Sequence, residues 1–198
     1  GADSETKKVK VIDQAPRITT MSFDDSDINE GETATLRGTV SDAGVHDVLT
    51  ATLSFNGSTL VLPVSMTGPG TGTFVFTLPV ADDEPSSGTP LDNLRVDVTV
   101  EDDDGGQVSD FEILTVHNVA PTLGVAIDPA LFIAGQALIT EGDSVRVMLT
   151  ISDASPDDTF TATLDWDDGV TQIERIPAGS TSWVVERLFA DDAPSGTT

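Results

Sequence analysis

The stretch Val116-His117-Asn118-Val119-Ala120-Pro121-Thr122 divides the chain. An alternation of apolar and polar residues runs into it, the Ala-Pro pair interrupts that alternation, and a second alternation starts behind it. A similar stretch, Val11-Ile12-Asp13-Gln14-Ala15-Pro16-Arg17, lies 105 residues earlier (121 − 16 = 105). Because this spacing is the size of one small domain, it predicts a tandem repeat.

Four further pairs of segments recur in the same order, at offsets of 109 to 111 residues. They are Asn29-Glu30-Gly31 with Thr140-Glu141-Gly142, Ser41-Asp42 with Ser152-Asp153, Thr50-Ala51-Thr52-Leu53 with the identical Thr161-Ala162-Thr163-Leu164, and Ala81-Asp82-Asp83 with Ala190-Asp191-Asp192. We therefore predict a terminal strand or remnant of a preceding repeat at 1–13, a first repeat at 14–118 and a second at 119–198.

Each repeat is predicted to consist of short β-strands. In the first repeat, apolar and polar residues alternate over 33–41, 48–55, 59–64, 73–78, 94–100 and 108–116, with Gly, Pro, Asn and Asp between these segments. No segment has a helical period. About seven short strands in 100 residues are typical of an Ig-like β-sandwich, so the predicted fold class is all-β. The segment Val9–Ile12 has the pattern of a further strand, and a frayed tail is the alternative interpretation.

The second repeat is predicted to be incomplete. The first repeat continues for 29 residues beyond Thr89 (118 − 89 = 29) and includes two strands, whereas the sequence stops at the matching point of the second. The second sandwich is therefore expected to lack its last two strands. Two interpretations are open: the sequence is part of a longer chain, or another chain supplies the strands by strand exchange.

The composition argues against several classes of partner. Nine Lys and Arg against 34 Asp and Glu give a net charge of −25, which disfavours nucleic acid and anionic membrane surfaces. It favours cations, or solubility in a salty exterior. There is no cysteine. There is also no apolar run of about 18 residues, the length that would predict a membrane span. All three lysines (Lys7, Lys8 and Lys10) lie within the first ten residues.

The sequence does not predict an enzyme. His46 and His117 are the only histidines, and no nucleophile elbow or similar motif accompanies either of them. The carboxylate pair Asp82-Asp83 recurs as Asp191-Asp192, and recurrence in tandem indicates a structural role, because a catalytic pair is seldom needed twice in series.

Acidic loops are expected to gather at the two ends of each sandwich, because successive strands run in opposite directions. Carboxylates gathered at one end repel one another unless a cation neutralises them, and oxygen ligands without His or Cys suit Ca²⁺. The alternative is that the loops are solvated turns, since Asp and Gly are ordinary turn residues. The predicted metal ligands are Asp13 in the first joint with Asp42, Asp47, Asp102 and Asp104 in the first repeat, and Asn118 in the second joint with Asp153 and Asp158 in the second repeat.

Several of these segments resemble the PKD-type repeats of large secreted bacterial proteins. They are Asn118-Val119-Ala120-Pro121, Glu141-Gly142, Ser152-Asp153, Asp165-Trp166-Asp167-Asp168-Gly169 and Val98-Thr99-Val100-Glu101-Asp102-Asp103-Asp104-Gly105-Gly106. The resemblance implies Ig-like sandwiches in tandem, extracellular display, and calcium at the joint and at the loop after the second strand. The chain departs from the family at Ser54-Phe55-Asn56-Gly57, where a Trp and an acidic-Gly turn are usual, and it has no Tyr. It is thus also similar to cadherin-like repeats.

We therefore predict a non-enzymatic extracellular repeat module, acting as a calcium-rigidified spacer or adhesion stalk of a large surface or secreted protein. The expected partners are neighbouring repeats of the same protein, together with self-association or a cell-surface ligand. Two alternatives remain open. One is a subunit of a surface layer or filament assembled by strand exchange, and the other is a carbohydrate-binding accessory domain of a secreted hydrolase, with Trp183 as a sugar platform.

Overall fold

The computed structural model describes residues 5–83, 90–128, 139–166 and 169–190, and the backbone of 132–133 and 136–137. The predicted all-β class is confirmed, because these residues form strands and turns without a helix. Accordingly, the described residues contain no helix long and apolar enough to cross a membrane. The chain forms two compact units, unit 1 at Gly1–His117 and unit 2 at Asn118–Thr198.

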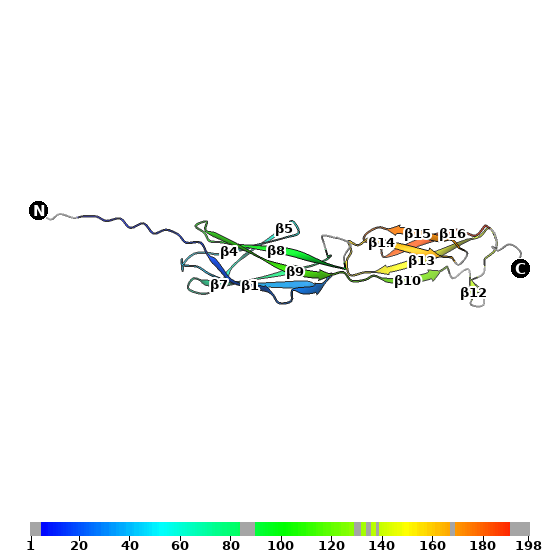
Figure 1. Ribbon diagram of the computed structural model, residues 1–198, viewed down its shortest axis with the longest axis horizontal. Helices are drawn as coiled ribbons and strands as arrows, with labels where there is room; N and C mark the ends of the chain where they lie inside the picture. Colours follow the sequence, from blue (N-terminus) through cyan, green and yellow to red (C-terminus); the bar gives the residue numbers. More distant parts are fainter. Residues whose placement is uncertain are drawn as a thin grey trace. The chain divides into compact units, whose positions relative to one another are not determined.

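Unit 1 is a sandwich of two sheets (Figure 1). The four-stranded sheet has the order β1 (Arg17–Phe23), β3 (Thr33–Ser41), β7 (Thr71–Pro79) and β6 (Ser65–Gly68). The five-stranded sheet has the order β2 (Asp27–Asn29), β9 (Gln107–His117), β8 (Leu91–Glu101), β4 (Thr50–Phe55) and β5 (Ser58–Pro63). All neighbours are antiparallel except β2, which is parallel to β9. This arrangement is that of an Ig-like β-sandwich.

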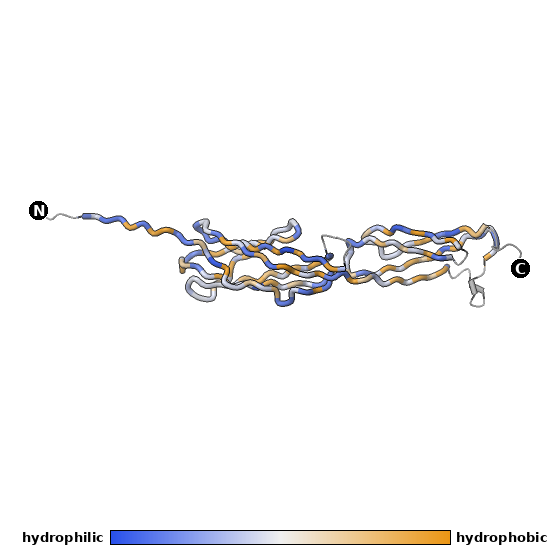
Figure 2. The backbone as a smooth tube through the Cα atoms, viewed as in Figure 1, coloured by the Kyte–Doolittle hydropathy of each residue, from blue (hydrophilic) through white to orange (hydrophobic). Residues whose placement is uncertain are grey.

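The core of unit 1 follows from the alternation in its strands, visible as alternating colours along the tube in Figure 2. On β8, the inward residues Leu94, Val96, Val98 and Val100 are at most 2% exposed. They face the buried side chains of β3 and β7 in one continuous cluster. Gly38 on β3 belongs to this packing, because a Cβ there would overlap the ring of Phe74. The glycine therefore leaves room for the tip of the Phe74 ring against the strand.

Unit 2 repeats part of this plan. One sheet has the order β10 (Thr122–Ile127), β13 (Ser144–Ser152) and β16 (Ser182–Leu188), and β14 (Phe160–Asp165) pairs with β15 (Thr171–Ile176). Two short strands, β11 (Phe132–Ile133) and β12 (Gln136–Ala137), pair with each other. The buried core comprises Val145, Val147, Leu149, Ile151, Ile176 and Val185. By order and register, β10, β13, β14 and β16 correspond to β1, β3, β4 and β7.

The sequence repeat has a counterpart in backbone hydrogen bonds. Gly31 donates to the carbonyl of Val80 at 2.7 Å, and Gly142 donates to the carbonyl of Phe189 at 2.7 Å. Both glycines have positive φ, 79° and 87°, which side chains disfavour. The recurring acidic-Gly pair therefore marks the same turn before the second long strand of each unit.

The strands of unit 1 differ from the sequence pattern in two places. Val9–Ile12 forms no strand in the described structure, and its side chains are exposed. An alternating pattern supplies a strand only where a sheet edge is available to pair with it. The short strands β2 and β6, of three and four residues, were not predicted, because so few residues show no alternation. The predicted similarity at Asp191-Asp192 lies outside the described residues.

Candidate metal centre

Three acidic segments meet at one end of unit 1. Pairing of β1 with β3 places Arg17 opposite Ser41, and pairing of β4 with β8 places Thr50 opposite Glu101. The segment before β1, the loop after β3 and the loop after β8 therefore begin or end at neighbouring positions. The predicted ligands of the first joint and the first repeat lie in these segments: Asp13, Asp42, Asp47, Asp102 and Asp104.

Three of these carboxylates converge. Oxygens of Asp13, Asp47 and Asp102 all lie within 4.8 Å of one another. Asp102 is buried, Asp47 is half-buried and Asp13 is exposed, so the group opens to solvent on the side of Asp13. We call these three residues the acidic group.

Hydrogen bonds hold the acidic loops in place. Asp102 Oδ1 accepts from the backbone N–H of Asp104 at 3.0 Å and of Gly106 at 2.7 Å. Asp103 Oδ1 accepts from the N–H of Val48 at 3.0 Å, which ties the loop after β8 to the loop before β4. The backbone of Asp104 therefore contacts the acidic group, but its carboxylate is not one of the three that converge.

Two carboxylate oxygens at this end are buried without a hydrogen-bond partner among the described residues, Asp102 Oδ2 and Asp42 Oδ2. Partial desolvation and, next, the charge of Asp102 raise the pKa of Asp13. Partial desolvation and, next, the charge of Asp42 raise the pKa of Asp47. Like charges in one place thus disfavour the ionised state, and a bound cation would reverse that effect.

Two glycines permit the close approach of these loops, and the sequence analysis assigned them no role. A Cβ on Gly44 would overlap the carboxylate of Asp47. A Cβ on Gly106 would overlap Asp102 Oδ2 and would lie 2.8 Å from the Cα of Ala15, in the joint before β1. The signal available in the sequence is a glycine two to four residues from each aspartate, which by itself also fits an ordinary turn.

The structure does not bring the predicted ligands of the second joint and the second repeat into a comparable group. Asp153 follows β13 as Asp42 follows β3, and its Oδ2 is likewise buried without a hydrogen-bond partner in the described structure. Asn118 is exposed before β10, and Asp158 is half-buried before β14. Among the described residues of unit 2, no three His, Asp or Glu side chains converge within 4.8 Å.

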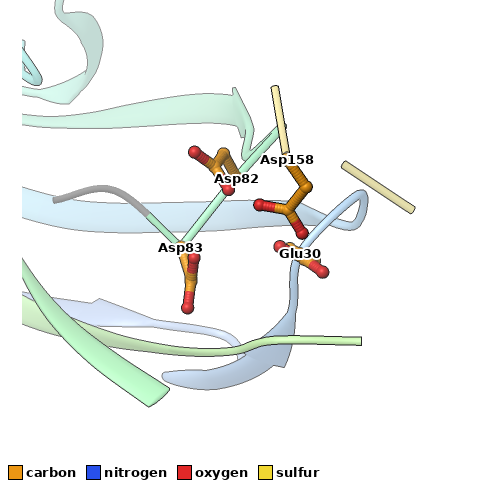
Figure 3. Close-up of side chains that lie close together, drawn as sticks. All are labelled: Glu30, Asp82, Asp83 and Asp158. Carbon is orange, nitrogen blue, oxygen red and sulfur yellow. The ribbon is translucent and has the colours of Figure 1, made fainter. Parts of the chain in front are cut away.

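A second group of carboxylates lies at the opposite end of β3. Oxygens of Glu30, Asp82 and Asp83 lie within 4.8 Å of one another, and all three side chains are buried (Figure 3). Burial and, next, the charge of Asp82 raise the pKa of Asp83. The nine residues of β3 separate Glu30 from Asp42 by roughly 30 Å, at about 3.3 Å per residue. The two groups of carboxylates are therefore too far apart to share one ion.

The structure also places the two histidines and the two tryptophans singled out from the sequence. His117 Nε2 lies 2.5 Å from Asp27 Oδ1 and connects the ends of β9 and β2. His46 is exposed. Trp166 and Trp183 pack against the core of unit 2. The Nε1 of Trp183 donates to Glu174 Oε2 at 3.3 Å.

Comparisons with known proteins do not assign the chain to a family. No family model matches it, and no curated protein matches it. A solved tetra-tandem repeat from the extending region of a large adhesion protein is 18% identical, with a TM-score of 0.49, over 88% of this chain and 42% of that one. Dimeric latent PorU from Porphyromonas gingivalis is 16% identical, with a TM-score of 0.40, over 95% of this chain and 18% of that one.

A 1.5-MDa bacterial ice-binding adhesin is also similar. It is 20% identical, with a TM-score of 0.36, over 90% of this chain and 56% of the solved one. The chain thus spans less than two thirds of the length of each of these three structures. Similarity at this level concerns the arrangement of strands and not the function of the chain.

Proposed function

We propose that the chain is a non-enzymatic repeat module of an extracellular spacer or adhesion stalk, and that Ca²⁺ stiffens the joint before unit 1. The observation that carries this proposal is the convergence of Asp13, which belongs to the joint, with Asp47 and Asp102, which belong to two loops of the sandwich. A cation held by all three would connect the joint to the body of unit 1.

The donor set fits calcium. Ca²⁺ takes six to eight oxygen ligands from irregular loops, and the ligands here are carboxylates without His or Cys. The buried free oxygens Asp102 Oδ2 and Asp42 Oδ2 supply acceptors that no protein donor satisfies in the described structure. A cation at the acidic group would neutralise the repelling charges and occupy the buried oxygen of Asp102.

The course of the chain fits a spacer. The chain enters unit 1 beside the acidic group, at the start of β1. Its last strand, β9, begins at the same end, where Gln107 pairs with Glu101, and runs to His117. Eleven residues at about 3.4 Å each span roughly 37 Å, so the chain enters and leaves at opposite ends of the unit. Units connected in this way add length when they repeat.

The test is calorimetric. The melting temperature of the chain is measured with excess calcium and with chelator. A ligand that binds only the folded state at a hundredfold excess over Kd stabilises it by about 2.7 kcal/mol. This corresponds to a rise of roughly 10 °C or more for a domain of this size.

Two variants locate the site. Asp102→Asn and Asp47→Asn are expected to abolish the calcium-dependent rise, because each removes a converging charge. Asp110→Asn, on the exposed part of β9, is the matched control and should respond as the unmodified chain does. An unmodified chain that melts at the same temperature with and without calcium would contradict the proposal, as would an Asp102→Asn variant that keeps the full rise.

The carbohydrate-binding alternative has less support. Trp183 packs against the core of unit 2, and its indole N–H is engaged with Glu174. A sugar platform needs an exposed aromatic face with free polar groups around it. The spacer proposal does not require this residue to be accessible.

A further inference from the structure

We propose that β5 of two copies of this chain pair antiparallel, edge to edge, so that the five-stranded sheets of two copies of unit 1 form one continuous sheet. The inference goes beyond the spacer function and does not depend on calcium. It rests on three features of unit 1: a long stretch of sequence without charge, an open and regular sheet edge, and apolar side chains exposed along that edge.

The stretch without charge covers residues 48–81. These 34 residues (81 − 48 + 1 = 34) contain no Asp, Glu, Lys, Arg or His. All 43 charged residues of the chain (9 + 34 = 43) therefore lie in the other 164 positions (198 − 34 = 164). The stretch includes β4, β5, β6 and β7. Two copies with a net charge of −25 each repel one another, and a surface built from this stretch lets them approach with the least repulsion.

The open edges of the two sheets differ in how well they are protected against pairing. Among the described strands, β1, β2, β5 and β6 each pair on one side only. β1 and β6 contain a register shift, and β2 has three residues and includes Asp27. Bulges, shortness and charges are common devices against edge pairing. β5 has six uncharged residues in one unbroken register with β4, and its one protective residue, Pro63, is the last of the strand.

The corresponding edge of unit 2 carries charges. β15 follows β14 as β5 follows β4, and each hairpin turn contains a glycine of positive φ, Gly57 or Gly169. β15 includes Glu174 and Arg175, whereas Ser58–Pro63 contains no charged residue. The two units thus share the hairpin but not the character of its edge. This is the expected difference if only the edge of unit 1 has a partner strand.

Apolar side chains line the edge at β5. Leu60 pairs with Leu53, which is 3% exposed, so Leu60 is on the inner side of the sheet, yet it is 42% exposed. Val61, on the outer side opposite Thr52, is 57% exposed. A sheet that continues beyond β5 would reduce the exposure of both side chains, which stabilises the paired state.

The backbone of β5 shows which of its polar groups face the open edge. Val64, just after the strand, donates its N–H to the carbonyl of Leu49 at 2.9 Å. Hydrogen-bonded pairs alternate along an antiparallel ladder, so every second residue counted back from Val64 bonds to β4. The two-residue turn at 56–57, with φ values of 45° and 71°, gives the same alternation. Thr59 and Val61, which lie between the bonded residues, therefore direct N–H and C=O groups to the open edge.

A two-fold arrangement uses these groups fully. With Leu60 opposite the partner's Leu60, Thr59 of each copy lies opposite Val61 of the other, and the two pairs form four backbone hydrogen bonds. Pro63, which has no N–H, lies outside these bonds. Because both copies contribute the same residues, the contact is isologous and closes as a dimer. One strand pair buries a small area, so the association is expected to be weak.

Sedimentation of the full chain in chelator measures this association without any contribution from calcium. The mean mass should increase with protein concentration towards twice that of the chain, and more so at high salt, which screens the repulsion between the copies. Val61→Pro should keep the chain monomeric, because it removes a donor from the open edge and leaves the bonds to β4 in place. Val61→Thr keeps the donor and should associate as the unmodified chain does. A chain that is monomeric at every concentration would overturn the proposal, as would a Val61→Pro variant that associates equally well.

Oxidative cross-linking tests the register, and it does not depend on the stability of the proline variant. The chain has no cysteine, so a single introduced thiol can form a disulfide only between copies. Leu60→Cys should cross-link rapidly under a mild oxidant, because directly opposed residues of a non-hydrogen-bonded pair have Cα atoms about 4.5 Å apart. Val61→Cys is the matched control and should cross-link slowly, since the two Val61 positions lie diagonally across the pair, at about 7 to 8 Å. Equal rates for the two variants, or a faster rate for Val61→Cys, would overturn this pairing.

Discussion

Leu53 and Leu164 occupy the same place in two identical tetrapeptides but have different surroundings. Leu53 on β4 is 3% exposed and lies between β5 and β8. Leu164 on β14 is half-buried and has β15 on one side only among the described strands. Replacing each leucine by alanine removes the same atoms. The difference between the two losses in the free energy of unfolding therefore measures the difference in packing.

The expected magnitudes differ by a factor of about three. Leu→Ala at a fully enclosed position costs 2.7 to 5.0 kcal/mol, so about 3 kcal/mol is expected for Leu53→Ala. At a half-exposed position roughly half of the transfer free energy is lost and no closed cavity remains, which gives about 1 kcal/mol for Leu164→Ala. With about 4 to 8 °C per kcal/mol, unit 1 should melt at least 12 °C lower and unit 2 about 4 to 8 °C lower.

The two tryptophans allow the units to be followed separately. Trp166 and Trp183 both lie in unit 2, so tryptophan emission reports its unfolding, while circular dichroism reports both units. Thr52→Ala and Thr163→Ala, at the neighbouring outward positions, are the matched controls and should change either transition by less than about 0.5 kcal/mol. Equal destabilisation by the two leucine substitutions, or a larger effect of Leu164→Ala, would refute the comparison of the two cores.

Three further predictions concern the acidic group and the turns. Gly106→Ala should lower the stability of unit 1 by about 1 to 3 kcal/mol and weaken the calcium response, because its Cβ displaces Ala15 and Asp102. Calorimetry with and without calcium checks this, and an unchanged calcium response would contradict it. In chelator, the free energy of unfolding should increase as the pH falls from neutral towards 3.8, since raised folded-state pKa values at Asp13, Asp47 and Asp83 let the folded chain bind more protons than the unfolded chain in that window. Urea titrations at several pH values measure this slope, and a decrease towards acid would refute it. Gly57→Ala should cost roughly 1 kcal/mol without altering calcium binding, because Gly57 has a φ of 71° in the hairpin between β4 and β5; an unchanged urea midpoint would disprove it.

Much of unit 1 could be predicted from the sequence because its inward and outward residues differ in kind. On β8, Leu94 and Val96 are buried while Arg95 between them is exposed, so alternation alone gives the strand and its inner face. The parallel pairing of β2 with β9 could not be predicted, because a strand of three residues has no pattern of its own and its partner lies some 90 residues away. Val9–Ile12 forms no strand among the described residues, which fits the frayed tail that the sequence left open, since its pattern is clear but no described strand of unit 1 pairs with it.

The acidic group could also be predicted from the sequence only in part. Strand direction was enough to place Asp13, Asp42, Asp47 and Asp102 at one end of the sandwich. It could not show that Asp13, Asp47 and Asp102 converge within 4.8 Å, because that depends on the approach of the joint to the loop at Gly106. Their role as calcium ligands remains a prediction, and so does the role of Asn118, Asp153 and Asp158 in the second joint and the second repeat.

The distribution of charge argues for a cation more strongly than its total does. A net charge that served solubility alone would be most favourable when spread over the surface, since separated charges are screened by salt. In unit 1 the carboxylates instead gather at two ends, where Asp47 and Asp83 have raised pKa values and Asp102 is buried. Such gathering destabilises the fold unless something neutralises it. The end that holds the acidic group also contains the joint, so neutralisation there would change stability and the freedom of the preceding segment together.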